Sequence, residues 1–159
     1  RRERHMFLFH DTYESRRDKM TEDKKYTLIV EDDADFAGLI ETIVKEQGLD
    51  AQVSFNGEDA LDQARYRRPD LVTLDIEMPR KSGLYFYRRM KSDPSLRHVP
   101  VIVITGVTPG DKDMENMVRS FLEVEYLPSP EAYIEKPFPA QALINAIHEV
   151  CPTKDHSHQ

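Results

Sequence analysis

Polar residues that could take part in chemistry follow short apolar runs at four places in this sequence. Each has an ordinary explanation when taken alone. A single acid at such a position usually caps a helix, a threonine usually belongs to a turn, and a lysine is usually solvated. Four such positions on one chain are difficult to ascribe to chance. They are Glu31-Asp32-Asp33, Asp75, Thr105-Gly106 and Lys136-Pro137.

Together, these residue types indicate a particular chemistry. Clustered carboxylates repel one another unless a cation lies among them. A small cluster of hard oxygen ligands suits Mg²⁺, which keeps several waters and takes its remaining ligands from a substrate phosphate. A carboxylate can also attack phosphorus and form an acyl phosphate, whose charge Mg²⁺, an ammonium group and a hydroxyl group would stabilise. The four positions therefore point to phosphoryl transfer onto an aspartate.

Short β-type runs alternate with helical patterns from Tyr26 onward, and these elements would position the polar residues. Parallel strands need right-handed crossovers, here helical, so the pattern predicts an open, doubly wound α/β sheet with helices on both faces. Sites in such sheets lie at the carboxyl ends of the strands. The expected strands are Tyr26–Val30, Ala51–Phe55 followed by the turn Asn56-Gly57, Leu71–Leu74, Pro100–Thr105 and Tyr133-Ile134. The expected helices have apolar positions within 36–44, 60–64, 84–91, 114–122 and 140–150.

The composition argues against several classes of function. The formal net charge is −7 and basic residues form no dense stripe, so direct binding of nucleic acid is not expected. The single cysteine, Cys151, can form neither an internal disulfide nor a cysteine-rich zinc site, and a reducing, cytoplasmic location is expected. The apolar runs are far shorter than the ~20 residues that a membrane-spanning helix needs.

Three regions are expected along the chain. Residues 1–25 mix basic and acidic side chains without an apolar period, and we interpret them as an N-terminal tail. The folded domain would occupy 26–151, followed by a C-terminal tail at 152–159. Because the sequence ends soon after the last expected helix, we expect a stand-alone domain that acts through protein partners or a domain separated from its output domain.

Four segments resemble the signature segments of response-regulator receiver domains, in the order found in that family. The resemblance extends from Tyr26 to about Cys151. It implies a flavodoxin-like, five-stranded parallel sheet with strand order 2-1-3-4-5. It also implies a bacterial two-component switch that is phosphorylated by a sensor histidine kinase, a phosphotransfer protein or a small phosphodonor. The segments are Thr27–Asp33, Asp75–Pro79 with Gly83, Val101–Gly106 and Tyr133–Phe138.

The resemblance assigns the metal ligands and the phosphoacceptor. Glu31 and Asp32 match the acidic pair that binds Mg²⁺ in the family, with Mn²⁺ as an alternative. Asp75 matches the phosphoacceptor, which is also a metal ligand, and Glu77 matches the residue whose backbone carbonyl completes the protein ligands. A receiver promotes only its own phosphorylation and dephosphorylation, so no enzymatic activity on another substrate is expected.

The remaining matches concern the switch. Thr105 matches the hydroxyl that closes onto the phosphoryl group, and Gly106 matches a small residue that leaves room for that group. Lys136 matches the ion-pair partner, and its bond to Pro137 is expected to be cis. Tyr133 matches the aromatic residue that turns inward on phosphorylation. A downstream protein or a second copy of the chain would then bind the face formed by 105–135 and the last helix.

The sequence also departs from the family pattern. Asp33 is an extra acid, and we expect it to cap the first helix. Ser82 stands where many relatives have an aspartate before Gly83. The stretch between Thr105 and Lys136 is longer than in typical relatives, and we assign the surplus to Glu123–Glu131, which leaves the shape of the output face open.

Three other functions fit parts of the pattern. A phosphatase of the haloacid dehalogenase type uses the same residue types in this order, but its nucleophile opens an Asp-x-Asp motif on the first strand. Its further acidic pair also has no counterpart after Lys136. A flavodoxin-like FMN carrier would bind phosphate in its first loop, where Glu31-Asp32-Asp33 would repel it. A receiver that is no longer phosphorylated would be a plain binding module, and the intact set of acids, Thr105 and Lys136 argues against that.

Overall fold

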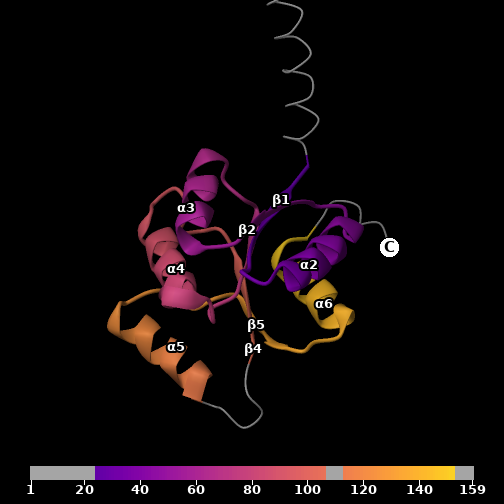
Figure 1. Ribbon diagram of the computed structural model, residues 1–159. Coiled ribbons are helices and arrows are strands. Elements are labelled where there is room, and N and C mark those ends of the chain that lie inside the picture. The colour runs from indigo at the N-terminus through magenta and orange to yellow at the C-terminus, as the bar shows by residue number, and fades with distance from the viewer. Residues whose placement is uncertain (1–23, 107–112, 153–159) are drawn as a thin grey trace, which may run out of the picture.

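The computed structural model describes residues 24–106 and 113–152, which form a parallel β-sheet with helices on both faces (Figure 1). The sheet has five strands in the order β2-β1-β3-β4-β5, which confirms the predicted fold and strand order. The strands are β1 (Tyr26–Val30), β2 (Asp50–Ser54), β3 (Leu71–Leu74), β4 (Val101–Gly106) and β5 (Ala132–Lys136). The helices are α2 (Ala34–Glu46), α3 (Gly57–Tyr66), α4 (Ser82–Ser92), α5 (Asp113–Val124) and α6 (Ala140–Val150), with a short 3₁₀ turn at Pro79–Lys81.

The predicted tails fall mainly on residues 1–23 and 153–159, which lie outside the described residues. None of the helices in the described part of the chain has both the length and the apolar character that crossing a membrane requires.

Successive residues of β1 contribute to opposite faces of the sheet, and each face has its own helices. Leu28 and Val30 pack with buried residues of α3, α4 and α5, whereas Ile29 packs with buried residues of α2 and α6. Figure 1 shows these two groups of helices on opposite sides of the sheet. All residues of β1 and β3 are buried, as expected of central parallel strands that are covered on both faces.

The register of the sheet brings the ends of the central strands level. Val30 pairs with Leu74 of β3, and Leu74 pairs with Val103 of β4. Hydrogen bonding continues one residue further, because the N–H of Asp75 donates to the carbonyl of Val30 at 2.9 Å. Glu31 and Asp75, the residues that follow β1 and β3, therefore start from neighbouring backbone positions.

Asp33 forms the N-cap of α2, as predicted. One of its carboxylate oxygens, Oδ1, accepts hydrogen bonds from the backbone N–H groups of Asp35 at 2.9 Å and Phe36 at 3.1 Å. The cap satisfies amides that the first turn of a helix leaves without partners. It also starts α2 directly after the acidic pair, so the two acids stay in the loop at the end of β1.

Asn56 and Gly57, predicted as the turn pair that closes the second strand, begin α3 as its N-cap and first residue. Asn56 Oδ1 accepts a hydrogen bond from the N–H of Asp59 at 2.9 Å, and Gly57 donates its N–H to the Ser82 hydroxyl at 2.6 Å. A Cβ atom at position 57 would lie 2.1 Å from the carbonyl oxygen of Ser82. Glycine therefore permits the close approach between the first turns of α3 and α4, and Ser82 fastens it.

The predicted insertion Glu123–Glu131 begins within α5, because the helix continues to Val124. The chain leaves the helix through Tyr126, whose φ of 55° is left-handed. Leu127 then donates its N–H to the carbonyl of Leu122 at 2.9 Å, which closes the end of the helix.

The remaining residues, the 125–131 connection, are docked on α4 and β4. The Tyr87 hydroxyl of α4 donates a hydrogen bond to the carbonyl of Pro128. The Glu131 carboxylate accepts a hydrogen bond from the N–H of Val101, the first residue of β4, at 2.6 Å. These contacts attach the connection to α4 and to the start of β4, the strand that ends at Thr105 and Gly106.

Candidate functional site

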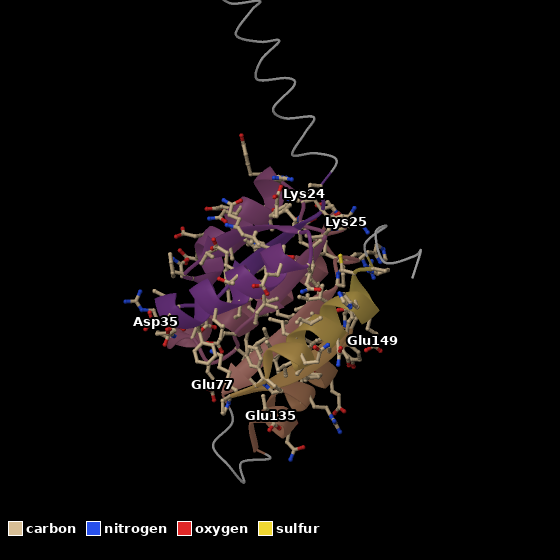
Figure 2. All side chains as sticks on the ribbon, turned by 90° about the vertical axis from the view of Figure 1, so that its right-hand side faces the viewer. Lys24, Lys25, Asp35, Glu77, Glu135 and Glu149 are labelled. Carbon is tan, nitrogen blue, oxygen red and sulfur yellow. The ribbon has the colours of Figure 1, made fainter. Side chains whose placement is uncertain are left out.

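The loops after β1 and β3 bring three carboxylates together at the carboxyl end of the sheet. One carboxylate oxygen from each of Glu31, Asp32 and Asp75 lies within 4.8 Å of the others. Glu31 and Asp75 are buried, with 1% and 4% of their surface exposed, whereas Asp32 is exposed. Figure 2 shows Glu77, from the loop after β3, at the end of the molecule opposite Lys24 and Lys25, which precede β1. Because Asp32 is the exposed member, the cluster is open to solvent on the side of Asp32.

Lys136, the last residue of β5, reaches across to this cluster. Its Nζ atom lies 2.8 Å from Glu31 Oε1 and 3.4 Å from Asp75 Oδ2. The lysine side chain is only 13% exposed, so water does little to screen these pairs. One ammonium group thus joins the acids that follow two different strands.

The charges in this cluster alter the pKa values of its members. Burial raises the pKa of Glu31 to about 7; the charge of Asp75 adds to this effect, and Lys136 opposes it. Burial alone would lower the pKa of Lys136, but its hydrogen bond to Glu31 and the charge of Asp75 outweigh burial and raise that pKa. A further cation near Glu31 would favour its ionised form.

The oxygen atoms of the cluster suit a divalent cation. Among the described residues, Glu31 Oε2 is buried and has no hydrogen-bond partner. Asp75 Oδ1 accepts a hydrogen bond from the backbone N–H of Glu77 at 2.9 Å, which holds the carboxylate in place. Hard carboxylate oxygens, few in number and open to solvent on one side, form a donor set that Mg²⁺ accepts.

The end of β4 contributes a hydroxyl group and a small residue. Thr105 is buried, and its Oγ1 also has no hydrogen-bond partner within the described residues. Thr105 pairs with Glu135 and Gly106 pairs with Lys136 in the sheet register. A Cβ atom at Gly106 would lie 3.0 Å from Glu77 Oε2, so a larger residue there would crowd the acid in the neighbouring loop.

Two of the sequence-derived candidates lie at the edge of this site. Tyr133 is in β5, three residues before Lys136, and 45% of its surface is exposed, so its side chain is outside the cluster. The peptide bond between Lys136 and Pro137 is cis. The structure thus joins Glu31, Asp32, Asp75 and Lys136 in one cluster, with Glu77 of the loop after β3 and Gly106 at the end of β4 beside it.

Comparison with known families decides the class of this site. A sequence model of the response regulator receiver domain matches residues 27–148. The chain belongs to the response regulator receiver family. The receiver is 36% identical over 123 residues to the polar-differentiation response regulator DivK of Brucella anthropi, which covers 77% of this chain and 93% of DivK. Its general function is therefore phosphorylation-dependent signalling in two-component systems.

Solved structures agree with the fold of this receiver. The receiver domain of a signal transduction histidine kinase from Syntrophus aciditrophicus matches with a TM-score of 0.66 and 31% identity, covering 79% of this chain and 89% of that one. The receiver domain of a sensor histidine kinase from Pseudomonas aeruginosa matches with a TM-score of 0.67 and 23% identity, covering 80% and 97%. The Pseudomonas structure contains a magnesium ion coordinated in its active site cleft.

Sequence reasoning missed one contact of this receiver. The ring of Phe36, in the first turn of α2, faces Lys136, whose Nζ atom lies 4.4 Å from the ring centroid. Periodicity alone assigned Phe36 to the apolar face of the helix. Its position shortly after the acidic pair, together with Phe138 two residues after Lys136, was the available signal that aromatic rings lie next to the site.

Proposed function

We propose that this receiver accepts a phosphoryl group on Asp75 and that the aspartyl phosphate changes its contacts with protein partners. The observation that carries the proposal is the position of Asp75 between two further carboxylates and an ammonium group. The donor is a sensor histidine kinase, a phosphotransfer protein or a small phosphodonor. Such donors act in the cytoplasm, and we assign the receiver to that compartment.

Glu31, Asp32 and Asp75 would hold Mg²⁺, with the backbone carbonyl of Glu77 as a further ligand; Mn²⁺ also suits this donor set. Glu31 Oε2, which has no hydrogen-bond partner in the described part of the chain, supports this assignment, as does the magnesium ion in the Pseudomonas receiver. When bound, the ion supplies positive charge that offsets the charge of the phosphoryl oxygens.

The chain's own residues perform the transfer. The ionised Asp75 carboxylate attacks phosphorus, and a new P–O bond forms while the bond from phosphorus to the donor breaks and the leaving group keeps the electron pair. Lys136, already 3.4 Å from Asp75 Oδ2, interacts with the added phosphoryl charge. The buried hydroxyl of Thr105, which has no partner among the described residues, donates a hydrogen bond to a phosphoryl oxygen.

The output follows from the movement of Thr105. Donation by its hydroxyl draws the end of β4 toward Asp75, and Tyr133, which is half-exposed in the neighbouring strand, turns inward. The face formed by 105–135 and α6 changes shape. Phosphorylation can favour one of two arrangements only through such differential contacts. A downstream protein or a second copy of the chain then binds that face in the phosphorylated state.

The test is intact-mass measurement after treatment with acetyl phosphate and Mg²⁺. The wild type should gain one phosphoryl group that base removes, and Asp75→Asn should gain none. Asp33→Asn is the matched control, since asparagine caps a helix as well as aspartate does, and it should gain the group normally. An adduct on His98, His148 or a hydroxyl would contradict the proposal. No adduct on the wild type would instead favour a receiver-like binding module.

A further inference from the structure

The ammonium group of Lys136 has an aromatic neighbour besides its two acids. Its Nζ atom lies 4.4 Å from the centroid of the Phe36 ring. The ring of Phe138, two residues after Lys136, lies 6.3 Å from that of Phe36 between centroids, at an interplanar angle of 47°. Both rings are partly buried, and the Phe36 ring forms an apolar surface beside the ammonium group.

The start of α2 fixes Phe36 in this position. Its backbone N–H donates to Asp33 Oδ1 at 3.1 Å, so the N-cap of the helix holds the backbone of Phe36. The acidic pair precedes this cap directly, and the same short segment therefore supplies both Glu31 and the ring that face Lys136.

The face of an aromatic ring attracts a cation within about 6 Å, and more strongly when the cation is shielded from water. Lys136 meets both conditions, because its Nζ atom lies 4.4 Å from the ring centroid and its side chain is 13% exposed. The ring differs from the two acids in one respect that matters for transfer. It attracts the ammonium group without requiring a directed hydrogen bond, so the N–H groups can turn from Glu31 toward new phosphoryl oxygens while the nitrogen stays beside Asp75.

We propose that Phe36 is a positioning residue for phosphoryl transfer, because its ring holds the Lys136 ammonium group beside Asp75 through a cation–π contact. The inference rests on the proposed phosphorylation of Asp75. It predicts that the rate constant for phosphorylation depends on the electron density of the ring at position 36, and not merely on an apolar side chain there.

The experiment measures the rate of phosphorylation by acetyl phosphate with Mg²⁺, followed by intact mass. Phe36→Leu should slow the reaction roughly fivefold, whereas Phe36→Tyr and Phe36→Trp, which keep a π face, should restore it. Phenylalanines carrying one, two or three fluorines at position 36 keep the shape of the ring and should slow the reaction progressively. Phe55→Leu is the matched control, since Phe55 is a half-exposed phenylalanine of the β2–α3 loop. A small phosphodonor avoids any effect of Phe36 on kinase binding.

A second measurement does not depend on activity. A ring at this distance shifts the NMR signals of the Lys136 ε-methylene protons upfield in the metal-free protein, and Phe36→Leu should abolish that shift while Phe36→Tyr keeps it. A rate that is unchanged in Phe36→Leu, or independent of fluorination, would overturn the inference and leave phosphorylation of Asp75 intact. A wild type that acetyl phosphate does not modify would overturn both proposals.

Discussion

At the scale of single residues, the site gathers three carboxylates, and two of them, Glu31 and Asp75, pair with the Lys136 ammonium group. Asp32 is the exposed member of the cluster, so it adds negative charge to the site while Lys136 lies against Glu31 and Asp75. Like charges held within a few ångströms of one another disfavour ionisation and favour the uptake of a cation. The acids are therefore arranged for binding and chemistry at some expense of stability in the metal-free protein.

This arrangement predicts the behaviour of Asp32→Asn. The variant should bind Mg²⁺ at least roughly tenfold more weakly, because a charged ligand is lost. Its metal-free form should unfold at the same or a slightly higher temperature, since repulsion falls. Isothermal titration with Mg²⁺ and thermal unfolding would measure both. Asp33→Asn should titrate like the wild type, and equal affinity in Asp32→Asn would refute the metal assignment.

Tyr26 gives a prediction on pH. Its hydroxyl donates to the carbonyl of Arg67, and burial raises its pKa from 10.0 to about 12, although the guanidinium of Arg67 opposes this. The unfolded chain therefore loses the phenolic proton first, and stability present below pH 10 is lost as the pH rises toward 12. The loss amounts to about 3 kcal/mol. Urea unfolding across this range should show a shallower decline in Tyr26→Phe, while Tyr66→Phe, at a 95% exposed position, should follow the wild type.

The residues of the site were predictable to different degrees. Glu31, Asp75 and Lys136 could be identified because each follows an apolar run, and parallel strands end at the same edge. The contact of Lys136 with Phe36 could not be predicted, because it depends on the direction of the Phe36 ring. The apolar spacing of the helix indicated only that Phe36 lies on its apolar face. The rotamer, and not the position along the chain, decides such a contact.

At the scale of elements, the 125–131 connection acts as a strap across α4 and β4. Lys91 of α4 is buried, and its Nζ atom donates to the carbonyls of Arg97 at 3.1 Å and Val99 at 2.9 Å. Glu131 Oε1 lies 3.9 Å from that ammonium group, while Oε2 accepts from Val101 at 2.6 Å. Burial lowers the pKa of Lys91, and the charge of Glu131 opposes that change. Glu131 thus joins three elements.

Replacing Glu131 tests this strap. Glu131→Ala would leave the N–H of Val101 without its acceptor and Lys91 without its nearby negative charge, and it should lower the free energy of unfolding by roughly 1–2 kcal/mol. Glu125→Ala is a control on the same connection, because Glu125 pairs with Arg88 at 3.8 Å between exposed side chains, and exposed pairs contribute little. Equal losses in urea unfolding for the two variants would show that Glu131 has no special role.

The elements were predicted by alternation, and the errors lie where stop and start signals are ambiguous. The last apolar position of the predicted helix was Leu122, whereas α5 extends to Val124, and no glycine or asparagine marks its end in the sequence. Tyr126 adopts the left-handed conformation instead. Asn56 and Gly57 look like a turn in sequence, and the contact of Gly57 with Ser82 that makes them a helix start is a tertiary one.

At the scale of the whole molecule, the loop that follows β3 and the residues that precede β1 lie at opposite ends of the receiver (Figure 2). Figure 2 shows Lys24 and Lys25 at the end opposite Glu77. Lys25 Nζ donates a hydrogen bond to the carbonyl of Pro152 at 3.1 Å. This bond connects the start and the end of the described domain, away from the carboxylates. Periodicity and topology rules predicted this layout. The shape of the face around the 125–131 connection was not predictable, because its docking depends on side chains from α4 and β4.

That docking defines where a phosphorylation signal should appear. Movement of Thr105 and Tyr133 would act on β4 and β5, and the 125–131 connection is attached to β4 through Glu131 and to α4 through Tyr87. Beryllofluoride, which mimics the phosphoryl group on Asp75, should therefore alter amide hydrogen exchange in β5, in the 125–131 connection and at the end of α5. The centres of α2 and α3 should stay unchanged, and Asp75→Asn should show no response. Changes confined to α2 and α3 would exclude this route, since the signal would then bypass the strap that connects the sheet to the output face.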